Sequence, residues 1–223
     1  MSEIKRVVSV GAHSLDAELL GGPLLIKYAD EGAHVTAITV TRGRLENGTD
    51  EEKSLYLKAV ESQEIEAAKK LGGDNLFLGY TGSNMPSLNE FADRMEKYFI
   101  EEKVDLVITH WRGSMHPRHI NTHDAVTEAV KRMRRNGYNI KLLYGETFED
   151  LVGFIPQAYY VLNESETERW FDALNCYQVY RGEVNNFPYT KYYPTNLQVR
   201  QIESGSKGNT VCYMYASLIE NTL

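Results

Sequence analysis

Short apolar runs rich in β-branched residues alternate with longer helix-like stretches over the first two thirds of the chain. The apolar runs lie at residues 6–10, 34–40, 75–78, 104–109 and 140–143. The stretches between them have the length and composition of helices, at residues 16–31, 53–71, 88–102 and 120–136, and Gly32, Gly72, Gly73 and Gly137 stand where helix C-caps are expected. This alternation predicts an α/β fold, Rossmann-like, with three layers and a mostly parallel sheet.

The pattern changes after Tyr144, and residues 145–223 are rich in Tyr and Asn. A strand at residues 158–162 and a helix at 164–177 are expected there, whereas residues 185–196 have an irregular pattern. We therefore expect one domain over the whole chain, in which 145–223 forms a C-terminal extension that lines the site. Because tyrosine is enriched at protein interfaces, this third of the chain is compatible with a homo-oligomer.

The composition and charge of the chain disfavour nucleic acid and membranes as partners. The chain has 223 residues, 42% of them hydrophobic, which is enough for one large core, and its net charge of −7 disfavours binding to nucleic acid. No apolar stretch approaches the roughly 18 residues of a membrane span, and the start leads into a strand without a signal-peptide core, so a cytoplasmic protein with no membrane partner is expected. Cys176 and Cys212 are far apart in the sequence, which predicts buried free thiols rather than a disulfide.

Two histidine motifs follow apolar runs, namely GAHSLD at residues 11–16 and HPRH at residues 116–119. In a doubly wound sheet of order 3-2-1-4-5, the first and fourth strands are neighbours, and ligands bind beyond their carboxyl ends. The topology therefore brings His13 and Asp16 close to the second motif. Histidine and carboxylate ligands suit zinc or a similar divalent metal such as iron, and three protein ligands with an open position indicate a catalytic site. The glycines of residues 11–22 lack the GxGxxG pattern of a dinucleotide site.

The other histidines have several interpretations. His119 is the favoured ligand of the second motif, because it would open a helix that faces the crevice. His116, just before it, would stabilise a developing oxyanion if protonated. His123 shares a helix face with His119, so it is a fourth ligand, a group that orients a ligand, or a packed histidine. His34 and His110 are expected to be structural.

These motifs resemble those of the PIG-L/LmbE-like family of metal-dependent N-deacetylases. The family motif AHPDD aligns with residues 12–16, and the family motif HPDH aligns with residues 116–119. Residues 41–43 and the helix containing residues 64–68 are similar to segments that follow the second strand of the family. The resemblance runs from about Val7 to Pro156 and weakens beyond that point.

The resemblance implies zinc held by His13, Asp16 and His119, and hydrolysis of an N-acetyl group on a sugar-like small molecule. In such an enzyme the metal lowers the pKa of water and a carboxylate takes the proton. Two positions depart from the family pattern, because Leu15 occupies the position of the general base and Arg118 that of an acidic residue in the second motif.

The departures leave three interpretations open. Another carboxylate serves as the base, with Glu18 and Asp124 the nearest to the motifs in sequence. Alternatively, the substrate brings its own acid or base, or the protein is a catalytically silent relative that binds metal or ligand. We expect a metal-dependent hydrolase, an N-deacetylase or related amidase acting on an amino-sugar-like molecule.

Overall fold

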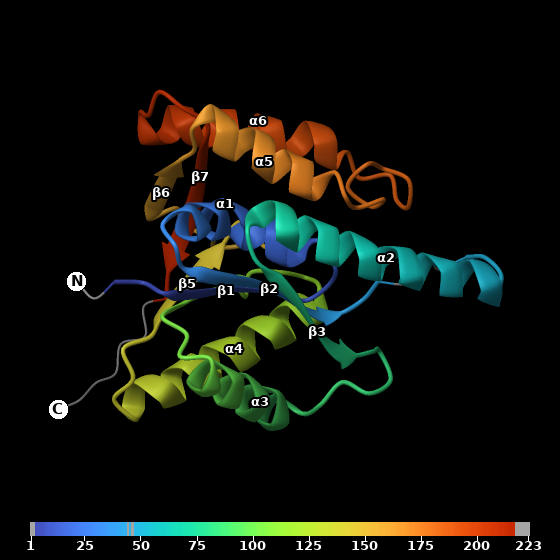
Figure 1. Cartoon of the computed structure of the whole chain (residues 1–223), viewed down its shortest axis with the longest axis horizontal. Helices are drawn as coiled ribbons and strands as arrows, with labels where there is room; N and C mark the ends of the chain where they lie inside the picture. Colours follow the sequence, from blue (N-terminus) through green and yellow to red (C-terminus); the bar gives the residue numbers. More distant parts are fainter. Residues whose placement is uncertain (1–2, 44, 46, 217–223) are drawn as a thin grey trace.

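The computed structural model describes residues 3–43, 45 and 47–216, so the last seven residues of the expected extension, 217–223, lie outside the described residues. One seven-stranded sheet of order β3-β2-β1-β4-β5-β7-β6 forms its centre (Figure 1). The strands are β1 (Arg6–Gly11), β2 (His34–Thr41), β3 (Asp74–Tyr80), β4 (Leu106–Thr109), β5 (Lys141–Gly145), β6 (Ala158–Val161) and β7 (Thr210–Tyr215). The helices are α1 (Asp16–Asp30), α2 (Asp50–Leu71), α3 (Leu88–Glu101), α4 (Pro117–Arg135), α5 (Glu164–Leu174) and α6 (Tyr189–Ser204).

The predicted α/β fold and the strand order 3-2-1-4-5 are confirmed. Strands β1 to β5 pair in parallel, with β1 between β2 and β4, and β7 adds to β5 and to β6 in antiparallel orientation. The order of the parallel strands reverses between β1 and β4, so the carboxyl ends of these two strands meet at the switch point where ligands bind in such sheets. Both histidine motifs follow these two strands.

The C-terminal third differs from its predicted pattern in two places. The segment expected to be irregular, 185–196, enters α6 at Tyr189, and β7 completes the sheet where no strand was predicted. Helix α6 contains Pro194 and several tyrosines, which are weak helix formers. Its stability comes from packing, because Tyr189, Tyr193 and Leu197 are buried.

Helices cover both faces of the sheet. Figure 1 shows α3 and α4 on one face and α1 and α2 on the other, with α5 and α6 lying beyond α1. Helices α1 and α5 approach closely at Gly22, since a Cβ atom there would lie 2.6 Å from the indole of Trp170. The Trp170 indole N–H donates to the carbonyl oxygen of Glu18 at 2.8 Å. These contacts fix α1, whose first turn carries part of the first motif.

The helix cap, the thiols and the helix lengths bear on three further predictions. Gly72 is the C-cap of α2, as predicted. Both cysteines are free thiols, with Cys212 buried and Cys176 partly exposed. None of the helices in the described ranges combines the length and the apolar character that crossing a membrane requires.

Candidate functional site

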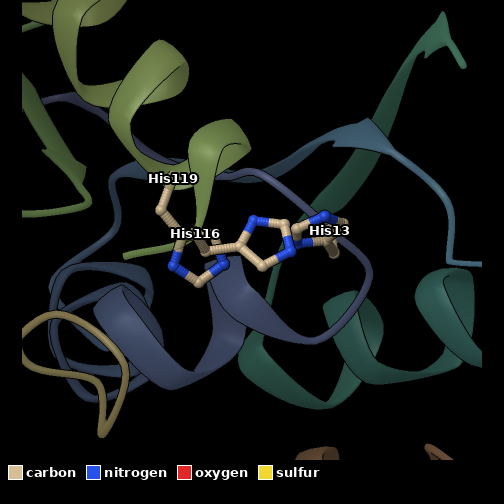
Figure 2. Close-up of side chains that lie close together, drawn as sticks. All are labelled: His13, His116 and His119. Carbon is tan, nitrogen blue, oxygen red and sulfur yellow. The ribbon is translucent and has the colours of Figure 1, made fainter. Parts of the chain in front are cut away.

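Three imidazole rings converge at the carboxyl edge of the sheet. Figure 2 shows His13, from the turn after β1, facing His116 and His119, from the start of α4. The ring centroid of His13 lies 4.6 Å from that of His116 and 5.3 Å from that of His119. Helix α4 begins here because His116 is its N-cap and Pro117 occupies the first helical position, where a missing N–H costs nothing. The structure thus brings the two motifs together.

Asp16 lies between the histidines. Its Oδ2 atom is 3.2 Å from Nδ1 of His13 and 3.4 Å from Nε2 of His119, and it accepts the backbone N–H of His13 at 2.7 Å. Burial alone would raise the pKa of Asp16, but the neighbouring polar rings of His119, His110 and His13 hold it well below its ordinary value. Asp16 is therefore an anion in the interior, surrounded by nitrogen ligand atoms.

Asp150 fixes the orientation of the His119 ring. Its Nδ1–H donates to Oδ1 of Asp150 at 2.8 Å, so the lone pair is on Nε2. That Nε2 atom is buried and has no hydrogen-bond partner among the described residues. A buried nitrogen with an unused lone pair beside a carboxylate fits a divalent metal, which would supply the missing partner.

The possible ligand atoms form two overlapping groups that share His119. His13 and His116 complete one group, and Asp16 and His110 complete the other; within each group the atoms lie within 4.8 Å of one another. The predicted ligands His13, Asp16 and His119 all belong to this cluster. The cluster fits a divalent metal of the zinc type, which nitrogen and oxygen ligands suit.

No motif in the sequence points to Asp150, a buried carboxylate that bridges two histidines of the site. Asp150 accepts hydrogen bonds from Nδ1 of His119 and, through Oδ2 at 2.7 Å, from Nδ1 of His110. These partners hold its pKa below the ordinary value in spite of burial, which acts in the opposite direction. Asp150 follows β5, whose carboxyl end lies beside that of β4, so the rule that joined the two motifs also applies to this loop.

His110, expected to be structural, is fully buried within the site. Burial opposes a charge on this ring, whereas the hydrogen bond to Asp150 and the charges of Asp150 and Asp16 raise its pKa to about 9. The backbone N–H of Ala12, however, donates to Nε2 of His110 at 2.9 Å, which requires a lone pair on that atom. We therefore assign the neutral ring, with its proton on Nδ1 and donated to Asp150.

Glu149, the neighbour of Asp150, is the carboxylate that reaches the cluster while remaining accessible. Its Oε2 atom lies 3.6 Å from Nε2 of His119, and its side chain is 37% exposed. Burial raises the pKa of Glu149, and the nearby carboxylates Asp16 and Asp150 add to that effect. The sequence provided no motif for this residue.

The two carboxylates proposed from the sequence as bases have other partners. Glu18 is fully buried, accepts a hydrogen bond from the Tyr177 hydroxyl at 2.8 Å, and has a pKa that burial raises to about 7. Asp124 accepts a hydrogen bond from the exposed Arg112 at 2.8 Å. Within the described ranges, neither carboxylate has a hydrogen bond or ion pair with the rings of His13, His116 or His119.

His116 and His123 have different environments. Burial and the neighbouring His13 and His119 lower the pKa of His116 to about 4, so its surroundings oppose the protonated form expected for oxyanion binding. Its Nδ1 accepts the backbone N–H of Arg118 at 3.3 Å, which leaves an Nε2–H donor on the neutral ring. The Nδ1–H of His123 donates to the backbone carbonyl of His110 at 2.9 Å, and its ring packs on Trp111 and Tyr144. Of the three interpretations of His123, these contacts favour that of a packed histidine.

Contacts with α2 hold the turn that precedes α1. Leu15 has a φ of 84°, which is uncommon for a residue with a branched side chain, and its side chain is buried in the core. The hydroxyl of Ser14 donates to Glu64 of α2 at 2.6 Å, and Arg42 pairs with the same carboxylate at 2.9 Å. These contacts explain why the segments 41–43 and 64–68 accompany the first motif.

The start of α6 lies against the loop that carries Glu149. Phe187 stacks on Phe148 with ring centroids 3.6 Å apart, and Tyr189 contacts both rings. Burial raises the pKa of Tyr189 to about 12, and the charges of Asp16 and Glu149 contribute. Part of the C-terminal third therefore packs beside the histidine cluster.

Comparisons with known proteins agree with this geometry. The family model described as PIG-L, GlcNAc-PI de-N-acetylase, matches residues 8–130, which include both motifs. A curated relative, the mycothiol S-conjugate amidase of Streptomyces coelicolor, is 25% identical over 201 residues, which cover 78% of this chain and 67% of that protein.

Solved structures share the fold over nearly the whole chain. GalB, the 4-carboxy-2-hydroxymuconate hydratase of Pseudomonas putida, superimposes with a TM-score of 0.75 at 14% identity, covering 99% of this chain and 100% of that one. The N,N'-diacetylchitobiose deacetylase of Pyrococcus horikoshii superimposes with a TM-score of 0.71 at 17% identity, covering 95% of this chain and 84% of that one.

Proposed function

The chain belongs to the PIG-L family, whose model describes a GlcNAc-PI de-N-acetylase, and from this premise we propose that it is a metal-dependent hydrolase of carbon–nitrogen bonds. Its substrate is an N-acyl, amino-sugar-like small molecule, in keeping with the amidase and deacetylase among its relatives. The observation that carries the proposal is the buried Nε2 atom of His119, which has no hydrogen-bond partner in the described part of the chain and lies 3.4 Å from Asp16.

The metal would be held by His13, Asp16 and His119, with zinc or iron the expected ion. When bound, such an ion lowers the pKa of a water molecule and polarises the carbonyl group of the amide. Asp150 holds His119 in the tautomer that leaves Nε2 free, and the Ser14–Glu64 contact fixes the turn that carries His13. The protein thus orients its ligand atoms before the metal arrives.

Glu149 is the residue that we assign as the general base in place of Leu15. Its carboxylate takes a proton from the attacking water as the oxygen bonds to the carbonyl carbon, and His116 donates its Nε2–H toward the developing oxyanion. Glu149 then returns the proton to the leaving nitrogen as the carbon–nitrogen bond breaks. The products are a free amine and a carboxylic acid, which balance the amide and the water consumed.

The second candidate function is a catalytically silent relative that keeps the metal pocket, favoured by Leu15 and Arg118. Leu15→Asp and Leu15→Asn distinguish the two, because only the first supplies a base and both fit the positive φ of this position comparably well. A large gain in amide hydrolysis with Asp alone supports a silenced scaffold. No gain supports a native mechanism that uses another carboxylate.

The first experiment is elemental analysis of the purified protein beside a His119→Ala variant. Near-stoichiometric zinc or iron in the parent, lost in the variant, supports the proposal and leads to a screen of N-acetylated amino sugars for amine release. A parent that stays metal-free under repletion contradicts it. A cytoplasmic location and a homo-oligomer are also proposed, and cell fractionation and analytical ultracentrifugation test them.

A further inference from the structure

Arg118 places a cation where the family motif has an acidic residue. It lies in the first turn of α4, one residue before His119, and its side chain is partly buried. The guanidinium extends to the carboxyl end of β2, where Nη1 donates to the hydroxyl of Thr41 at 3.2 Å. That hydroxyl in turn donates to the carbonyl oxygen of Ala12, the residue before His13, at 2.9 Å. The charge therefore lies beside the histidine cluster.

The guanidinium is held by groups that carry no charge. Besides Thr41, it lies against Gly82 in the segment after β3, where a Cβ atom would be 2.7 Å from Nη2. A larger residue at position 82 would force the guanidinium to move. The hydrogen bond and this close contact together fix the position of the charge.

Arg118 has no acidic partner among the described residues, since none of their carboxylates lies within ion-pair distance of it. Other arginines near the site are paired, Arg42 with Glu61 and Glu64, and Arg112 with Asp124. A partly buried guanidinium without a carboxylate is costly unless an anion joins it. Of its five N–H donors, one is used by Thr41, which leaves enough for a bidentate contact with an anion.

We propose that Arg118 binds an anionic group, a carboxylate or a phosphate, on the substrate whose amide lies at the histidine cluster. This inference rests on the proposed hydrolase for the reaction but concerns which substrates the site accepts. The planar guanidinium matches the two oxygens of such a group, and a neutral amino sugar leaves the cation unpaired. Arg118 is therefore a specificity-determining residue, and its departure from the family motif changes the substrate rather than removing activity.

The test uses the metal-loaded full chain and three probes, namely succinate, inorganic phosphate and neutral succinamide, with affinity measured by titration calorimetry. Succinate or phosphate is expected to bind the parent, and Arg118→Gln is expected to weaken that binding by about ten- to a hundredfold. The affinity for succinamide is expected to be the same in the parent and in the Arg118 variant. Tighter binding of succinate than of phosphate identifies a carboxylate substrate, and the reverse order identifies a phosphate.

Two further variants control for charge and folding. Arg112→Gln removes an exposed guanidinium that is already paired with Asp124 and should leave anion binding unchanged. If Arg118→Gln unfolds, Arg118→Lys serves in its place, because it keeps the charge but loses the planar fork and should weaken binding by about tenfold. The proposal is overturned if neither anion binds the parent, or if both bind the Arg118 variants as tightly as the parent. A protein that binds no metal, or that cleaves no amide, would contradict the hydrolase proposal, and these results are distinct from those of the anion titrations.

Discussion

The Asp150 carboxylate accepts the Nδ1–H of His119 at 2.8 Å, and this contact leaves Nε2 of the ring with its lone pair free in the interior. The same carboxylate also holds His110. One residue of the loop after β5 thus fixes the orientation of two imidazoles at the carboxyl edge of the sheet. Orientation of a ligand by a hydrogen-bonded carboxylate is a common way to raise metal affinity.

Replacement of Asp150 by Asn should weaken metal binding by about 10- to 100-fold, because the amide neither attracts the imidazole proton as strongly nor fixes the tautomer. Competition with a chromogenic chelator measures the change. Asp124→Asn is the matched control, since that carboxylate pairs with the exposed Arg112 and should leave the affinity unaltered. Equal affinities in the parent and the Asp150 variant would show that the bridge has no part in metal binding.

The difference between Asp16 and Asp150 shows how far the sequence could predict the site. Asp16 lies in a recognisable motif directly after a β-branched run, and the rule for parallel sheets placed that motif beside the second one. Asp150 and Glu149 stand in a loop without a motif, and their role depends on β5 lying next to β4 and on how the loop turns back. Local pattern carries no information about that turn.

The C-terminal third was the least predictable part of the fold for a related reason. Helix α6 exists because Tyr193 and Leu197 find buried positions, and β7 exists because the edge of β5 is available for pairing. Helix α6 and strand β7 both depend on contacts with the rest of the fold. The alternation of apolar runs and helix-like stretches in residues 6–143, by contrast, can be recognised from the local sequence. Sequence patterns therefore brought together the residues proposed as metal ligands but did not identify the residues that pack around them.

Phe187→Ala should destabilise the loop that carries Glu149. The Phe187 ring stacks on Phe148 at 3.6 Å, so its removal takes away the apolar contact that holds the loop against the start of α6. Both rings are partly buried, so we expect a loss of about 1–2 kcal/mol in the free energy of unfolding, measured by urea denaturation. Metal content should stay constant while kcat/KM falls, and Phe187→Leu should retain most of both properties. A fall in metal content instead would place the effect at the ligands.

Because the His123 ring is buried, we expect the free energy of unfolding to depend on pH. Burial lowers the pKa of His123 below the ordinary value of 6.5, so the unfolded chain binds more protons than the folded one just below that pH. The stabilisation is therefore complete above pH 6.5 and is lost as the pH falls through the folded pKa. His123→Asn keeps a donor for the His110 carbonyl but does not titrate, so its free energy of unfolding should fall less than that of the parent between pH 7 and pH 5. Parallel curves for the two proteins would indicate that His123 titrates alike in both states.

Glu149→Gln should abolish most of the proposed amide hydrolysis without emptying the site. Glu149 lies 3.6 Å from Nε2 of His119 yet is not among the proposed ligands, so metal content and KM should change little. Loss of a general base lowers kcat by about 10²- to 10⁴-fold, and Glu149→Asp should recover part of that loss. Steady-state kinetics of amine release measures both effects, with the exposed Glu168→Gln as a control. If Glu149→Gln keeps full activity, the base is another carboxylate, and the same kinetics on Asp124→Asn and Glu18→Gln would identify it.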